Sequence, residues 1–296
     1  MRAFHPNIGW LIAVALLTAF AVAPRAGQRP EPDVDLTQTL LRVGQRIEQW
    51  YARAQTIVSR ETVSIQPLRA DLTPVDFPRR LVFELRVGWD PEHMGHGVVP
   101  EASVLRAVLT VDGRPVRDGD DPGCMDPKPV SPEPLTILLP ARLAQSEFSL
   151  GDTVRVDGRA ALVIDYRGVA AAPPPDITWR AECVTVSLPG RSRGRVWVDA
   201  ETYDVLRLGD RLVGEFEFDV PGDYVRRGAS RSMVIERAET SIRYTRVPFT
   251  DPQETLMLPA SIDTLTVIRG HGVQRFRISQ RFTDHRRFLT GGRLLY

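Results

Sequence analysis

Residues 80–87 read Arg-Leu-Val-Phe-Glu-Leu-Arg-Val, and the pattern of this stretch decides the fold. Its apolar side chains fall at every second position and share one face, whereas Arg80, Glu84 and Arg86 share the other; only Val82 is out of place. A period of two is typical of a β-strand with one buried face and one solvated face. The stretch therefore predicts a half-buried strand.

The same alternation recurs along most of the chain, with turn residues between the runs. Parallel strands require crossovers of about a dozen residues or more, and none of that kind appears in roughly the last 140 residues. The sheet is therefore expected to be antiparallel, with about eleven strands. The clearest runs are residues 57–66, 80–87, 105–111, 196–199, 205–208, 216–218, 242–244, 262–268 and 276–282.

Two helical segments accompany these strands. Asp35 can cap a helix whose apolar positions recur at spacings of three and four, namely Leu36, Leu40, Val43, Ile47, Trp50 and Ala54. Residues 134–148 predict a second short helix or a turn-rich segment, because Pro140 interrupts a continuous helix. The expected fold class is α+β: a long curved antiparallel sheet, a half-barrel of about eleven strands, with helices covering one face.

The N-terminus has the order of a secretory signal. Arg2 precedes the uncharged apolar run of residues 8–23, and Pro24-Arg25-Ala26-Gly27 follows it, with small residues at 26 and 27. The run is shorter than the roughly 20 residues that span a bilayer, which favours a cleaved signal over a retained anchor. We expect residues 1–26 to be a signal peptide, residues 34–296 to be a single domain with an insertion near 117–134, and the mature protein to be periplasmic or secreted.

Charge and cysteine content narrow the function further. The 296 residues carry 38 lysines and arginines against 37 aspartates and glutamates, which argues against nucleic-acid binding by bulk charge. The only two cysteines are Cys124, in a loop rich in Pro, Gly and Asp, and Cys183, in an expected strand. Because an oxidising compartment lets disulfides persist, export favours a Cys124–Cys183 bridge, the alternative being two unpaired small apolar side chains.

Candidate catalytic and metal motifs fit poorly with their surroundings. Gly190-Arg191-Ser192-Arg193-Gly194 has the spacing of a hydrolase nucleophile elbow, but a strand follows it instead of the required helix. Glu92, His93 and His96 have side chains that zinc prefers, but the glycines between and after the histidines disfavour a shared helical face. A loop with solvent-facing histidines is the favoured interpretation, and a metal enzyme using these residues is the less favoured one.

Four aspartates gather in the insertion, at Asp118, Asp120, Asp121 and Asp126. They lack the ligand order of an EF-hand, so a solvated acidic loop is favoured over a calcium site. No phosphate-binding loop or dinucleotide fingerprint occurs. We therefore expect no catalytic residues, no metal and no cofactor.

The remaining feature is the apolar face of the expected sheet. A curved sheet with one apolar face can be filled by its own helices or can leave a hollow for an apolar guest. The residues that would line this hollow are Leu81, Phe83, Leu85, Leu105, Leu109, Phe216, Phe218, Phe276, Ile278 and Phe282. For each of these residues taken singly, an ordinary place in the core is the favoured interpretation.

Several segments resemble the periplasmic lipoprotein carrier family LolA and its RseB and LppX relatives. They are residues 56–66, Arg79-Arg80-Leu81-Val82-Phe83-Glu84-Leu85, Val111-Asp112-Gly113-Arg114-Pro115-Val116, residues 194–207, Leu258-Pro259 and residues 282–288. The most specific are Gly194-Arg195-Val196-Trp197-Val198-Asp199-Ala200-Glu201-Thr202 and the C-terminal segment, which are similar to poorly characterised secreted bacterial relatives.

The resemblance implies a half-barrel whose helices form a lid over bound lipid acyl chains. In the carrier an arginine before an early strand ties down the lid, and Arg79 or Arg80 is the nearest match. The resemblance thus predicts a non-catalytic binding protein for a lipid, a lipoprotein acyl chain or another amphiphile in the cell envelope. The alternative is a protein-interaction or envelope-stress sensing module of RseB-like type, with an envelope protein as partner.

Overall fold

The computed structural model describes residues 34–54, 56–88, 103–117, 120, 124, 130, 133–169, 173–180 and 183–287. The expected signal peptide, the Glu92, His93 and His96 loop and most of the insertion lie outside the described residues. The described residues from Asp35 onward belong to one compact unit.

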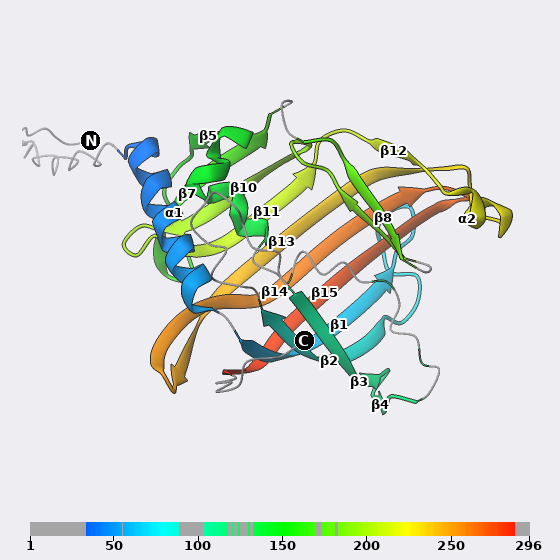
Figure 1. Ribbon diagram of the computed structural model, residues 1–296, viewed down its shortest axis with the longest axis horizontal. Coiled ribbons are helices and arrows are strands. Elements are labelled where there is room, and N and C mark those ends of the chain that lie inside the picture. The colour runs from blue at the N-terminus through cyan, green and yellow to red at the C-terminus, as the bar shows by residue number, and fades with distance from the viewer. Residues whose placement is uncertain are drawn as a thin grey trace, which may run out of the picture. The chain divides into compact units, whose positions relative to one another are not determined.

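The main element of this unit is an antiparallel sheet of 13 strands (Figure 1). Eleven strands form a path in the order β4-β3-β2-β1-β15-β14-β13-β11-β10-β7-β5, while β12 pairs with β13 and β6 with β7. Within the described ranges the end strands β4 and β5 do not pair with each other, so the sheet is open. These findings confirm the expected α+β class and the curved, open antiparallel sheet.

The strands follow the alternating runs of the sequence closely. They are β1 (Ile57–Pro67), β2 (Arg79–Gly88), β3 (Ser103–Val111), β4 (Arg114–Pro115), β5 (Ser146–Leu150), β6 (Val154–Val156), β7 (Arg159–Gly168), β10 (Ser192–Asp199), β11 (Val205–Leu212), β12 (Phe216–Asp219), β13 (Ser232–Thr250), β14 (Gln253–Arg269) and β15 (Val273–Arg287). The first and last strands are neighbours, with Val63 opposite Gln280 and Ile65 opposite Ile278.

Helix α1 (Leu36–Arg53) covers one face of this sheet, which we call the inner face. Asp35 caps the helix as expected, accepting a hydrogen bond from the Thr37 amide at 2.9 Å. The buried stripe of α1 packs on strand residues such as Val196, Leu208 and Ile262. Neighbouring residues on each strand alternate to the opposite side, which we call the outer face.

Two 3-10 helices, η3 (Glu133–Leu138) and η4 (Pro140–Gln145), pack beside α1. Pro140 opens η4 after an extended Leu139, so the expected interruption is confirmed; Phe148, at the end of the predicted segment, lies in β5 instead. Contact with α1 is close at Gly44, where a Cβ atom would lie 3.0 Å from both the Leu138 carbonyl oxygen and Pro140 Cδ.

A separate hairpin covers another part of the inner face. It consists of β8 (Asp176–Arg180) and β9 (Cys183–Ser187), and it packs on Phe216, Phe218, Leu212 and Ile268. The ring centroid of Trp179 lies 4.6 Å from that of Tyr224, which belongs to the short helix α2 (Gly222–Arg226). The Cys124–Cys183 disulfide, predicted from export, is present and ties the insertion to β9. Figure 1 shows α1 and β8 in front of the same side of the sheet.

Candidate functional site

The N-terminal half of α1 is held by the turn between β10 and β11. Arg42 donates to the Tyr203 hydroxyl at 2.8 Å, and its guanidinium lies 5.2 Å from the centroid of that ring. Arg46 forms an ion pair with the buried Asp204 at 2.5 Å, and Arg246 approaches the other oxygen of Asp204 at 3.4 Å. A buried carboxylate needs such partners, so Asp204 is a fixed point to which the helix is attached.

Asp199 makes this turn rigid. Its carboxylate accepts hydrogen bonds from the amides of Glu201 and Thr202 at 3.0 and 2.8 Å, and Arg159 lies 2.6 Å from it. Burial alone would raise the pKa of Asp199, but these hydrogen bonds and the Arg159 charge outweigh it and lower the pKa. The Asp199–Asp204 segment, the most specific part of the resemblance, therefore holds an ionised, ordered turn beneath α1.

The C-terminal half of α1 is attached to β14. The Trp50 indole donates to the Met257 carbonyl at 2.6 Å, and Arg53 forms an ion pair with Glu254 at 3.1 Å. The helix is thus joined to the sheet by one apolar stripe and by polar contacts near both ends. The sequence predicted the apolar stripe but not these polar contacts. The arginines on the polar side of the helix were the sequence feature that could have indicated them.

A small cavity lies beneath the last turn of α1. Its volume is about 40 Å³, which is room for a few waters, since a space of about 10–15 Å³ admits one. The lining is mostly apolar and comes from α1 and four strands: Trp50, Ala54, Ile57, Ser59, Leu85, Val87, Val130, Tyr244, Leu258, Pro259, Phe282 and His285. In this arrangement α1 fills the space beside the sheet.

The imidazole of His285 lines this cavity, and one of its ring nitrogens is buried. Its Nδ1 has no hydrogen-bond partner. Burial lowers the pKa of His285, and the neighbouring Asp284 carboxylate opposes the shift only in part. The imidazole is therefore held in its neutral form.

Polar groups interrupt the inner face farther along the strands. The Glu61 carboxylate is 0% exposed and accepts from Arg106 at 2.8 Å and from Gln280 at 2.7 Å. On the other half of the sheet the Tyr166 hydroxyl donates to Asp210 at 2.5 Å, and its ring lies over Gly194, where a Cβ atom would be 2.5 Å from the Tyr166 oxygen. The inner face is therefore not one continuous oily surface.

The residues expected to line a hollow fall into separate clusters. Leu81 and Phe83 pack with Ile278, Leu85 and Phe282 lie under α1, and Phe216 and Phe218 lie under the β8–β9 hairpin; Phe276 is half-buried. Of the ten, the structure brings only Leu85 and Phe282 together at the cavity under α1.

The expectation for Leu105 and Leu109 is wrong. Their side chains are 63% and 38% exposed, on the outer side of β3. Arg106 is the ion-pair partner of buried Glu61, so Arg106 lies on the inner face, and alternation places Val104 and Val108 there with it. The sequence pattern indicated the opposite face because an arginine is normally found on the solvated side of a strand.

Arg79 and Arg80 lie at the start of β2. The end of β2 that is near α1 is the other one, where Val87 pairs with Ile57, the first residue of β1 after α1. The Arg80 amide donates a hydrogen bond to the Asp112 carboxylate at 2.8 Å. Their part in holding a lid stays a prediction. Among the described residues, the polar contacts of α1 include those of Arg42, Arg46 and Arg53 and that of the Trp50 indole.

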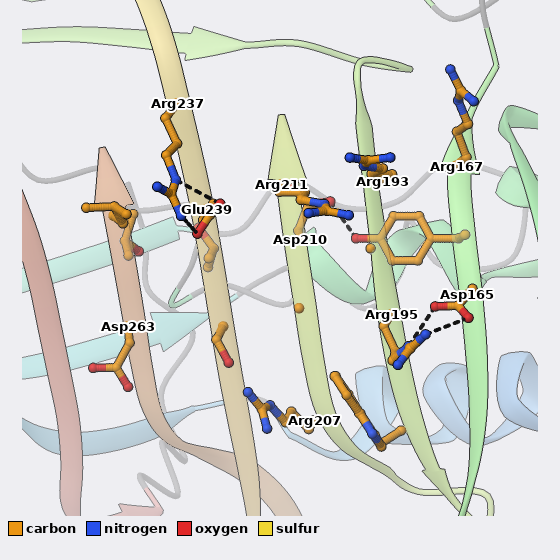
Figure 2. A pocket seen from close by; sticks show the side chains of 18 of the residues that line it. Asp165, Arg167, Arg193, Arg195, Arg207, Asp210, Arg211, Arg237, Glu239 and Asp263 are labelled. Carbon is orange, nitrogen blue, oxygen red and sulfur yellow. Dashed lines mark hydrogen bonds and ion pairs between the residues drawn. The ribbon is translucent and has the colours of Figure 1, made fainter. Parts of the chain in front are cut away.

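The outer face carries a second hollow, an open depression of about 980 Å³ (Figure 2). Register places its side chains in rows across β5, β7, β10, β11, β13, β14 and β15. One row is Glu147, Arg167, Arg193, Arg211, Glu239, Leu265 and Arg277; the next is Ser149, Asp165, Arg195, Gly209, Ser241, Asp263 and Ser279. The sequence showed these residues only as the polar side of alternating strands.

Other chemistry finds little support among the described residues. They contain no group of three or more His, Cys, Asp or Glu side chains placed to hold a metal. Ser192 begins strand β10 and is followed by more strand, unlike a nucleophile elbow. In the described part of the chain no helix has the length and apolarity needed to cross a membrane.

Solved structures of similar fold exist at low sequence identity. A DUF1329 family protein from Desulfovibrio piger is 9% identical, with a TM-score of 0.41, over 88% of this chain and 96% of that one. A LolA superfamily protein from Nitrosomonas europaea is 11% identical, with a TM-score of 0.30, over 83% and 93%.

A lipoprotein-sorting protein domain from Vibrio parahaemolyticus is 12% identical, with a TM-score of 0.30, over 85% and 94%. No protein-family model and no curated protein matches the chain. With TM-scores below 0.5 these likenesses carry no argument about function, which rests on the chain's own residues.

Proposed function

We propose that this chain is an exported, non-catalytic binding protein that takes the apolar chain of an amphiphile between α1 and the inner face of the sheet. The observation that carries the proposal is the cavity beneath the last turn of α1, with its largely apolar lining from helix and sheet. Because α1 covers this lining with one stripe of side chains and is attached by polar contacts near its ends, it has the construction of a lid.

The arrangement in hand is the closed one. A cavity of about 40 Å³ holds only a few methylene-sized groups, given that a space of about 10–15 Å³ admits one water. Ligand entry then consists of α1 leaving the strands under its C-terminal half, with the apolar chain replacing the side chains of the helix. The exposed apolar area of the open state would be offset by the burial of the ligand.

Export is part of the same proposal. The disulfide between Cys124 and Cys183 is of the kind that persists in an oxidising compartment. Mass measurement of the mature protein from a periplasmic fraction tests it: a chain that begins near residue 27 supports signal cleavage, and a full-length chain in the membrane fraction counts against it.

Native mass spectrometry with lipid extraction tests ligand carriage directly. Protein exported to the periplasm and purified without detergent is expected to carry an acyl species and, once stripped, to bind a fluorescent fatty acid such as cis-parinaric acid. An empty protein that also ignores the fatty acid would remove the proposal.

Variants connect the binding to the lid. Ser59→Leu fills the cavity from β1 and is expected to weaken fatty-acid binding at least tenfold, whereas Asp204→Asn frees Arg46 and is expected to speed ligand entry. Leu41→Ser on the exposed side of α1 is the matched control and should change neither. Equal effects of all three would place binding elsewhere.

A second candidate function is docking of an envelope protein. Phe77, in the loop before β2, is 97% exposed, and exposed Val75 lies in the same loop. The exposed Leu105 and Leu109 lie in the adjacent strand β3, and exposed Val116 directly follows β4. Apolar side chains gathered near a sheet edge are typical of interaction sites. A photocrosslinking residue at position 77 should trap one partner in cells, whereas the same residue at exposed Val154 should not; identical products from both would reject this candidate.

A further inference from the structure

The row of arginines on the outer face is not explained by amphiphile binding on the inner face. Arg167 pairs in register with Arg193, and Arg193 with Arg211, so three guanidinium groups extend from the neighbouring strands β7, β10 and β11. Neighbouring strands lie about 4.8 Å apart, so the backbones that carry these three cationic side chains lie within about 10 Å of one another. Like charges directly opposite each other destabilise a sheet, and the protein therefore gives up stability to keep this row.

Nearby carboxylates do not neutralise the row. Asp165 makes a two-pronged contact with Arg195 at 2.7 and 2.9 Å, and Glu239 makes one with Arg237 at 2.8 and 3.0 Å. Figure 2 shows both pairs beside the row, with their acids turned to their own partners.

The guanidinium groups of the three arginines make no hydrogen bond or ion pair within the described part of the chain, including with Glu147 opposite Arg167. The row therefore keeps an uncompensated positive charge.

The floor of the depression is shaped to admit a ligand beside this row. Gly209 lies between Arg195 and Ser241 in register and contributes no side chain, which leaves the centre of the depression open. The edge of Trp197 borders this gap: a Cβ atom at Gly209 would lie 3.7 Å from Cζ3 of the ring. Arg207 stacks on the same ring at 4.8 Å from its centroid, so an aromatic wall stands next to the cationic row.

We propose that this depression binds a soluble ligand carrying two or more neighbouring phosphate groups. The planar guanidinium fork matches phosphate oxygens in a two-pronged manner, and three forks spaced by one strand each can engage two adjoining phosphates at once. Because the ligand would lie in a hollow between rows of side chains, the site suits a small molecule better than it suits the flat surface of a membrane. Binding would also relieve the repulsion among Arg167, Arg193 and Arg211.

Calorimetric titration with sodium diphosphate in 50 mM and 150 mM salt tests the proposal on the full mature chain. Diphosphate should bind at least tenfold more tightly than orthophosphate or sulfate, and Arg193→Gln should weaken it at least tenfold. The control Arg114→Gln removes the same charge from β4 at the far edge of the sheet and should change affinity less than twofold. Equal affinity for all three anions, or equal losses in both variants, would overturn the proposal.

Two further measurements locate the ligand and its source. Diphosphate should change the fluorescence of Trp197, and Trp197→Phe should abolish that change while retaining the calorimetric signal; an unchanged fluorescence response in Trp197→Phe would place the ligand elsewhere. Cosedimentation with vesicles of phosphatidylglycerol and cardiolipin distinguishes a lipid headgroup from a soluble phosphate. Vesicle binding that depends on Arg193, without any binding of soluble diphosphate, would overturn the proposal.

Discussion

Breaking the buried ion pair between Glu61 and Arg106 is expected to be the most destabilising single change on the inner face. Glu61 is 0% exposed and the Arg106 side chain is 12% exposed, so Arg106→Met leaves a carboxylate in the interior with Gln280 as its remaining donor. Removing one partner of a buried pair costs about 3–5 kcal/mol. For a domain of this size that corresponds to a fall in Tm of roughly 6–20 °C.

The cause can be separated from lost packing with a second substitution. Glu61→Gln in the Arg106→Met background removes the buried charge but keeps an amide oxygen that accepts from Gln280. If the uncompensated charge is the main cost, the double variant should regain at least half of the lost stability. Glu61→Gln alone should cost less than Arg106→Met, because Arg106 can extend its head towards solvent.

Equilibrium unfolding in guanidinium chloride, followed by tryptophan fluorescence, measures all four proteins of this cycle. A lower midpoint with an unchanged slope identifies a change in stability rather than in the unfolded state. An Arg106→Met variant within about 1 kcal/mol of the parent, well under the cost of a broken buried pair, would refute the reasoning. So would a double variant no more stable than Arg106→Met.

Four other substitutions have definite expected outcomes. Tyr166→Phe should cost about 1–3 kcal/mol by removing the donor to buried Asp210; Asp210→Asn should cost less at pH 7, because burial raises the pKa of Asp210 and disfavours its charge, and equal losses in chemical denaturation would contradict this. Gly44→Val should cost about 1–3 kcal/mol in thermal unfolding, because the added atoms meet η3 and η4; an unchanged Tm would count against the contact. Burial lowers the pKa of His285, so its contribution to stability is present above the unfolded value of about 6.5 and is lost as the pH falls through the lower folded pKa; His285→Gln should flatten this acid dependence between pH 7.5 and 5.5, and a parallel dependence in both proteins would reject the assignment.

The alternation of the strands and the capped first helix could be predicted from the sequence because both are local. Side chains at every second position must share a face, and Asp35 needs only the amide of Thr37 to cap α1. Antiparallel order followed from the missing crossovers. The disulfide followed from the compartment, although its geometry depends on the whole fold.

The site could not be predicted in the same way because it depends on which strands become neighbours. The buried Glu61 sits in an alternating strand beside Val63, and its need for Arg106 becomes visible only once β1 pairs with β2 and β2 with β3. The same need turns Leu105 outward. The arginine row is likewise a product of register, since Arg167, Arg193 and Arg211 are far apart in the sequence.

The position of β15 (Val273–Arg287) between β1 and β14 constrains how the chain reaches its native state. The first four strands have no route to the rest of the sheet except through this last one, so the two halves of the sheet stay unpaired until β15 joins them. Contacts between such distant parts of a chain make folding slow. The sheet is therefore completed only when β15 is in place, and a polypeptide truncated before residue 273 would leave two unjoined sheets exposed to proteolysis.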